Sequence, residues 1–144
     1  MKPLALNFLI FLTFCIQITG QETDSVKYKS LIPKDFYTAF LKSDKAILID
    51  VREGFEFRPS HLKKAINIPA SGNMEYAADT INKEYSVFFY CTTGFRSKRV
   101  AKIFCEKGFR DVYSLDGGIV AWRKAGMPVV KKRHTTNDTR LREE

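Results

Sequence analysis

Short apolar runs alternate with amphipathic segments along the chain. Residues 46–51 (AILIDV) and 87–90 (VFFY) are nearly continuous apolar runs, a pattern typical of strands that are covered on both faces of a parallel sheet. Segments with apolar residues at helical spacing separate such runs. Further strands are expected at 65–68 and 111–115, and helices at 30–42, 74–81, 97–107 and around Ile119 and Trp122, where Gly126 and Pro128 end the last helix.

This alternation predicts an α/β domain with a parallel, doubly wound sheet. Ligands of such sheets bind beyond the carboxyl ends of the strands. The run AILIDVRE ends in Asp50, Arg52 and Glu53, and the run VFFYC ends in Cys91. We therefore expect these four side chains at the same edge of the sheet.

Residues 1–20 have the layout of a signal peptide. Lys2 is followed by a mostly apolar segment at 4–18, and the small residue Gly20 precedes Gln21. The apolar segment falls short of the roughly 20 residues of a spanning helix. We expect export to the periplasm or the medium, with no stable membrane association after cleavage. The alternatives are an uncleaved anchor and, less favoured because Phe14 is bulky, a lipoprotein modified at Cys15.

The predicted domain organisation is a signal peptide at 1–20, one domain at 21–128 and a polar, disordered tail at 129–144. The formal net charge is +8, and the basic residues are scattered except for residues 131–133. Together with export, this pattern favours a solvated surface over a nucleic-acid partner. A mild preference for anionic substrates is compatible with the same charge.

The exported part would keep two cysteines, Cys91 and Cys105, which are too few for a disulfide framework. A helix starting at Ser97 would carry Cys105 about 12 Å along its axis. Bridged Cα atoms lie within roughly 7 Å of each other, so both thiols are expected to be free. Cys105, on an apolar helix face, is expected to pack in the core. No metal or cofactor is expected.

The segment that follows the third strand combines features of an anion cradle. Cys91 ends the strand, Gly94 permits a tight curl, Arg96 adds a positive charge, and a helix opens at Ser97. Backbone N–H groups at a helix N-terminus can converge on one point and carry partial positive charge. Such a site favours the thiolate of Cys91, which is the nucleophilic form. The alternative is a buried structural cysteine.

Four stretches in sequence resemble the single-domain rhodanese-like sulfurtransferases. The resemblance implies a rhodanese-like domain with a central, mostly parallel five-stranded sheet. It also implies that Cys91 takes a sulfane sulfur from a small anionic donor such as thiosulfate. The resulting persulfide would pass the sulfur to a thiophilic acceptor such as cyanide, a thiol or a protein. The stretches are ILIDVRE (47–53), SHLKKAINIP (60–69), YCTTGFRS (90–97) and EKGFRDVYSLDGGIVAW (106–122).

The same resemblance implies roles for the residues around Cys91. Backbone N–H groups of the active-site loop would hold the persulfide, and Arg96 would meet the anionic donor or the leaving sulfite. Asp50 and Arg52 would support the loop. The loop residues are Thr92, Thr93, Gly94, Phe95 and Arg96.

The chain departs from the family pattern at three positions. Thr92 stands where a basic residue is frequent, which makes the loop less positive and thiosulfate a modest substrate. Ser60 and Lys64 stand where glycine is common. His61 lies in the same region and is expected to be structural rather than a general base.

Two other functions remain open. Phosphatases and arsenate reductases also use a cysteine thiolate and an arginine, but with five residues between them. Four residues separate Cys91 from Arg96, and this shorter loop favours sulfur over a tetrahedral oxyanion. A sulfur carrier that serves only a protein partner is the second alternative.

Overall fold

The central sheet of this protein has five parallel strands. The computed structural model describes residues 27–132, so the predicted signal segment at 1–20 and residues 133–144 of the predicted tail lie outside the described part. The strand order is β1-β6-β5-β2-β4, and every neighbouring pair is parallel. The strands are β1 (Lys29–Leu31), β2 (Ala46–Asp50), β4 (Ile66–Asn67), β5 (Ser86–Tyr90) and β6 (Val112–Leu115).

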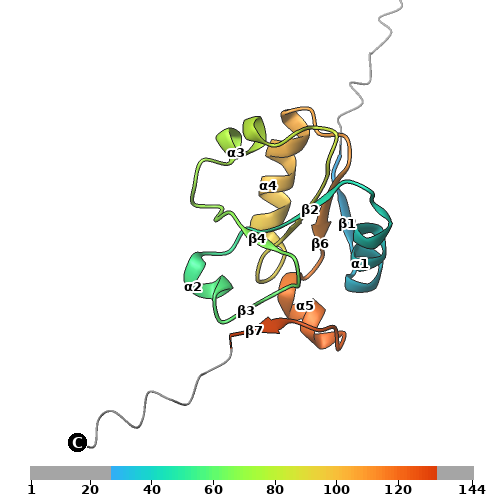
Figure 1. Ribbon diagram of the computed structural model, residues 1–144, viewed down its shortest axis with the longest axis vertical. Helices are drawn as coiled ribbons and strands as arrows, with labels where there is room; N and C mark the ends of the chain where they lie inside the picture. Colours follow the sequence, from blue (N-terminus) through green and yellow to red (C-terminus); the bar gives the residue numbers. More distant parts are fainter. Residues whose placement is uncertain (1–26, 133–144) are drawn as a thin grey trace, which may run out of the picture.

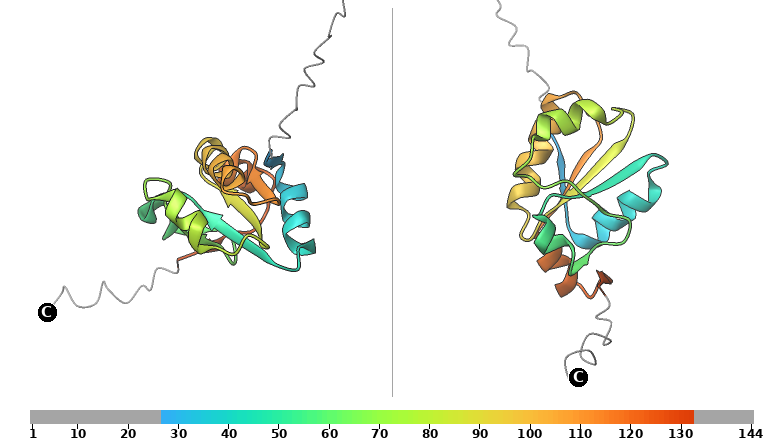
Figure 2. Two further views of the ribbon diagram at one scale, coloured as in Figure 1. Left: turned by 90° about the horizontal axis from the view of Figure 1, so that it is seen from above. Right: turned by 60° about the vertical axis from the view of Figure 1, so that its left-hand side comes forward.

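Helices cover both faces of this sheet, as the predicted doubly wound fold requires. Alternate residues of β5 point to opposite faces: Val87 and Phe89 belong to one buried cluster, and Phe88 and Tyr90 belong to the other. The first cluster includes residues of α3 and α4, and the second includes residues of α1 and α5. Figure 1 and Figure 2 show the sheet between these helices, which are α1 (Pro33–Lys42), α3 (Met74–Thr80), α4 (Phe95–Glu106) and α5 (Gly118–Lys124).

Two short elements that the sequence pattern did not predict lie at the end of the sheet where β6 ends. One is the single-turn helix α2 (Gly54–Phe57), and the other is a two-stranded ribbon in which β3 (Ser60–His61) pairs antiparallel with β7 (Val130–Lys131). In Figure 1 these elements and α5 gather at the lower end of the molecule. Because β7 pairs with β3, the fold continues past residue 128, where the sequence pattern placed the start of the disordered tail.

The start of the first helix also differs from the prediction. Residues 30 and 31 are part of the edge strand β1, and the helix begins only at Pro33. Proline suits the first helical turn because its missing N–H would have no partner there. A strand of three residues is too short to produce a hydrophobic alternation, so the sequence alone did not distinguish it from the helix that follows.

The other helices of the sequence prediction lie close to their expected positions, and Cys91 and Cys105 are both unpaired, as predicted. Within residues 27–132 no helix is long and apolar enough to cross a membrane. In the same range there is no cluster of three or more histidine, cysteine, aspartate or glutamate side chains that could hold a metal ion.

Lys64, at a position where the sequence resemblance led us to expect glycine, has a φ of 69°. Left-handed backbone costs a residue with a Cβ roughly 1–2 kcal/mol, and glycine avoids this cost at the expense of a more flexible unfolded chain. We predict that Lys64→Gly raises the free energy of unfolding by about 0.5–1 kcal/mol. Urea denaturation checks this, with Lys63→Gly, which should not stabilise, as the control. A Lys64→Gly protein less stable than the parent would contradict the prediction.

Candidate active site

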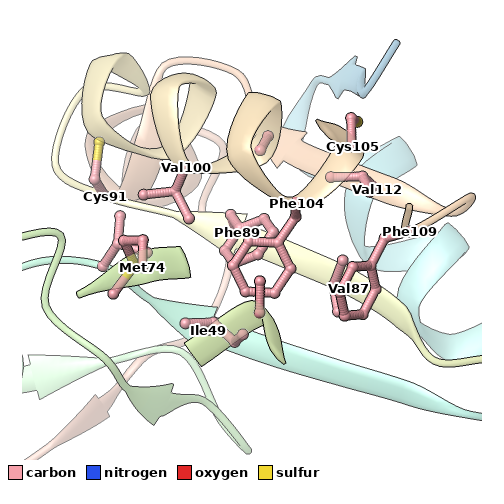
Figure 3. Close-up of a cluster of buried hydrophobic side chains, with 13 residues drawn as sticks. Ile49, Met74, Val87, Phe89, Cys91, Val100, Phe104, Cys105, Phe109 and Val112 are labelled. Carbon is pink, nitrogen blue, oxygen red and sulfur yellow. The ribbon is translucent and has the colours of Figure 1, made fainter. Parts of the chain in front are cut away.

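The thiol of Cys91 lies at the carboxyl end of β5, directly after Tyr90. The residue is only 1% exposed. Its Sγ accepts a hydrogen bond from the backbone N–H of Gly94 at 3.1 Å. In Figure 3 the sulfur lies beside the first turn of α4, while Cys105 lies near the other end of that helix. The predicted nucleophile therefore sits under the N-terminus of α4, and the two thiols are separated along the helix.

The curl between β5 and α4 depends on Gly94, which is the N-cap of α4 and has a φ of 93°. The helix begins at Phe95, two residues earlier than the sequence pattern indicated, so Arg96 lies inside the first helical turn. The backbone N–H groups of Thr93 and Gly94 are directed at the sulfur of Cys91. Thr93 and Phe95 are both exposed. The loop residues expected from the sequence are thus brought together around the thiol.

A second helix N-terminus fixes this loop, and the sequence analysis did not identify it. The N–H of Ile119 donates to the carbonyl of Cys91 at 2.9 Å, and the N–H of Val120 donates to the carbonyl of Thr92 at 3.2 Å. Helix α5 approaches this closely because its N-cap Gly117 and its first residue Gly118 have positive φ, 68° and 59°. In the sequence, the pair Gly117-Gly118 within the stretch 106–122 could have indicated this close approach. Only the tertiary structure shows that the helix after this pair contacts the loop that follows Cys91.

The pKa of the Cys91 thiol is lowered by its surroundings. Burial is the largest single influence and opposes ionisation, but the hydrogen bonds that favour the thiolate outweigh it. These come from the backbone N–H groups of Ser97, Thr93 and Gly94 and from the Ser97 hydroxyl. The pKa of Cys105 is raised instead, by burial and by the charge of Glu106. Of the two thiols in residues 27–132, Cys91 therefore has the electrostatics of a reactive thiol and Cys105 does not.

We predict that the two thiols titrate in opposite directions. Because the thiolate is the reactive form, a lowered pKa moves the rise of alkylation rate to lower pH, and a raised pKa moves it to higher pH. Iodoacetamide labelling of Cys91, followed in a Cys105→Ala protein, should have its midpoint below the ordinary cysteine pKa of about 8.5. Labelling of Cys105 in a Cys91→Ser protein should have its midpoint above that value. A Cys91 midpoint at or above 8.5 would contradict the site.

The hydroxyl of Ser97 is a further polar group beside the sulfur. Its Oγ lies 3.8 Å from the Sγ of Cys91 and 3.0 Å from the carbonyl oxygen of Gly94, and its single proton can be donated to either. It also accepts a hydrogen bond from Ser114 on β6 at 3.0 Å. Both serines are fully buried, so this short chain holds the first turn of α4 against the sheet.

Arg96 does not stand alone at the loop, because it forms an ion pair with Glu56 of α2. The Nη1 and Nη2 atoms of Arg96 donate to the two carboxylate oxygens of Glu56 at 2.7 and 2.8 Å. The hydroxyl of Thr92 donates to Glu56 at 2.8 Å and accepts from Arg96 at 2.9 Å. The sequence analysis missed Glu56, which no motif marked as part of the site.

Asp50 and Arg52 form a buried ion pair at the end of β2. The Nη2 of Arg52 lies 2.6 Å from Asp50 Oδ2 and also donates to the carbonyl of Ser60 at 2.8 Å. The amide of Asn67 donates to the carbonyls of Asp50 and Arg52. These contacts fix the two ends of the segment that carries α2. Within the described residues, the side chains of Asp50 and Arg52 form no hydrogen bond to loop residues 92–96. Their support of the loop is therefore indirect, because they hold the segment whose Glu56 contacts Arg96.

We predict that Asp50→Asn lowers the free energy of unfolding by about 3 kcal/mol. Removing one partner of a buried pair leaves the other charge without compensation, which typically costs about 3–5 kcal/mol, and the remaining amide recovers part of the hydrogen bonding. Urea denaturation measures the loss. The control is Glu84→Gln, which removes an exposed partner of Lys45 and should cost less than about 1 kcal/mol. Equal losses in the two proteins would contradict the structural role of Asp50.

His61, which the sequence analysis expected to be structural, lies in β3. Its ring stacks on Phe57 with 4.1 Å between ring centroids, and its Nδ1 lies 3.2 Å from the carbonyl of Phe57. These contacts support a packing role next to α2.

Comparison with known proteins agrees with this fold. The family described as the rhodanese-like domain matches residues 33–125. The chain belongs to this family. Solved structures support the assignment: a rhodanese-related protein from Thermoplasma volcanium has a TM-score of 0.64 at 27% identity and covers 73% of this chain and 100% of its own. A rhodanese with anions from E. coli has a TM-score of 0.50 at 32% identity, covering 60% of this rhodanese-like chain and 99% of its own.

Curated relatives of this rhodanese-like protein include a tRNA uridine(34) hydroxylase of Chlamydia caviae. It is 32% identical over 104 residues, which cover 67% of this chain and 31% of the relative. The homologous protein of Chlamydia trachomatis is 30% identical over 110 residues, covering 72% and 34%. The chain thus spans about a third of the length of these relatives, and their name describes the whole proteins.

Proposed function

We propose that this rhodanese-like protein transfers sulfane sulfur through a persulfide on Cys91. The observation that carries the proposal is the position of the Cys91 sulfur, under converging N–H groups that lower the pKa of its thiol. In the first step the thiolate attacks the outer sulfur of the donor. The S–S bond of the donor breaks, and the leaving group departs with the electron pair, as sulfite when the donor is thiosulfate.

In the second step the acceptor attacks the outer sulfur of the Cys91 persulfide. A thiophile such as cyanide or a thiol takes that sulfur, and Cys91 leaves again as the thiolate. The N–H groups that stabilise the thiolate also suit the negative outer sulfur of the persulfide. The proposed partners are therefore a small sulfur donor and a thiophilic acceptor, which can be a protein.

Two features support sulfur over phosphate as the transferred group. The loop between Cys91 and Arg96 has four residues, and the guanidinium of Arg96 is already paired with Glu56. A dianionic phosphate would therefore meet a small cradle with little net positive charge. A carrier that delivers sulfur only to a protein remains the alternative that the same geometry supports.

The test is a thiosulfate–cyanide assay on the protein, combined with mass spectrometry of the Cys91 peptide. We expect one added sulfur after the donor and its removal by cyanide, with negligible hydrolysis of an aryl phosphate. Loading with sulfur but no turnover with small acceptors would favour the carrier. Robust phosphate hydrolysis with no added sulfur would overturn the proposal.

A further inference from the structure

Arg96 is the only positively charged side chain among loop residues 92–96, and it is already paired with Glu56 in the absence of a sulfur donor. Arg96 binds both oxygens of Glu56 and the hydroxyl of Thr92, and these contacts use three of its five N–H groups. The bidentate contact is the strongest geometry that arginine makes with a carboxylate. An anionic donor therefore has to compete with Glu56 for this guanidinium.

Glu56 is charged under all ordinary conditions. The hydrogen bonds from Arg96 have the largest effect on its carboxyl and lower the pKa. Burial acts in the opposite direction, and the hydrogen bond from Thr92 lowers the pKa further, to about 2. It also accepts from the backbone N–H of Glu53 at 3.1 Å, which ties the carboxylate to the start of α2. At neutral pH the charge of Glu56 therefore offsets that of Arg96, which also interacts with Cys91, and the N–H groups add to the positive field around the sulfur.

The consequence depends on the charge of the donor. A dianionic donor that displaces Glu56 from Arg96 leaves the Glu56 carboxylate unpaired and close to the negative charge of the donor. A dianionic donor that does not displace Glu56 meets an ion pair with no net positive charge. Both outcomes penalise a donor in proportion to its negative charge. A donor that carries one negative charge or none suffers less from either.

We propose that Glu56 is a specificity-determining residue that selects persulfides of thiols over dianionic thiosulfate as sulfur donors. This rests on the proposed sulfur transfer by Cys91. With such a donor, R–S–SH, the Cys91 thiolate attacks the outer sulfur and the S–S bond of the donor breaks. The thiolate R–S⁻ leaves with the electron pair, and the outer sulfur with its proton remains on Cys91 as the persulfide. No net oxidation or reduction occurs.

The experiment compares two donors by the rate at which Cys91 gains sulfur, followed by mass spectrometry of quenched samples. The donors are thiosulfate and the persulfide of 2-mercaptoethanol, which has an uncharged organic part. The variant is Glu56→Gln, which keeps the shape and removes the charge. Glu53→Gln, at the N-cap of the same helix, is the matched control, since it removes an equal charge from a residue that is not a side-chain partner of Arg96 within the described residues.

The expected result is that Glu56→Gln raises the ratio of thiosulfate to persulfide rate constants about tenfold, while Glu53→Gln leaves the ratio within about twofold. The ratio cancels any change in the thiolate fraction of Cys91, because both donors need the same thiolate. An unchanged ratio in Glu56→Gln, or an equal change in both variants, would overturn the inference.

Failure of the underlying function has a different signature. If Cys91 of the parent protein gains sulfur from neither donor, the proposed sulfur transfer itself is wrong. Circular dichroism establishes whether Glu56→Gln is folded. If it is not, Glu56→Ala and Glu56→Asp replace it: the ratio should rise in the alanine protein and stay low in the aspartate protein, and equal ratios in these two would overturn the inference.

Discussion

Cys91→Ser should abolish sulfur transfer completely, because a serine hydroxyl cannot form a persulfide. The substitution exchanges one atom at a site that is 1% exposed, so the fold should remain intact. The measurement is thiocyanate formation from thiosulfate and cyanide, with mass spectrometry of both cysteine peptides. No added sulfur is expected on any peptide of the variant.

The control for this prediction is Cys105→Ala. Cys105 packs in the core from the buried face of α4, and its raised pKa makes it a poor nucleophile. Sulfur transfer should stay within about threefold of the parent, and the loss of stability should be a few kcal/mol at most, as for other small core truncations. Sulfur found on Cys105 alone, or equal loss of activity in both variants, would contradict the assignment of Cys91.

Gly118→Ala should disrupt both the loop and the fold. A Cβ at this position would lie 2.5 Å from the carbonyl oxygens of Cys91 and Thr92, which are backbone atoms that cannot swing aside. The positive φ of 59° adds backbone strain. Strain and overpacking together suggest a cost of about 3–5 kcal/mol, and sulfur transfer should fall at least about 100-fold because the N–H groups around Cys91 must move.

Gly126→Ala is the matched control for this second prediction. Gly126 also has a positive φ, 72°, but nothing lies within 4 Å of the position of an added Cβ. It should therefore cost only the strain of the backbone, about 1–2 kcal/mol, and leave sulfur transfer unchanged. Urea denaturation and the transfer assay separate the two effects. Equal behaviour of the two alanine variants would show that the contact of α5 with the loop is unimportant.

The hydrophobic pattern by itself determined the layered α/β fold. The apolar runs that became β2 and β5 are buried on both faces, and such runs predict a parallel sheet wherever the chain returns through helices. The same pattern placed Cys91 at the carboxyl end of a strand, and the local residues Gly94 and Arg96 indicated the cradle. The burial of these strands and the shape of the loop after Cys91 depend on residues that are close together in the sequence. A local pattern can therefore predict them.

Only the tertiary structure decided which distant groups complete the site. Glu56 reaches Arg96 from 40 residues away, and the N–H of Ile119 reaches the carbonyl of Cys91 from a separate helix. The strands β1 and β7 are likewise too short to have a periodicity of their own, and they exist because β6 and β3 offer unpaired edges. Contacts of this kind follow from the packing of whole elements, which a local pattern of polar and apolar residues does not encode.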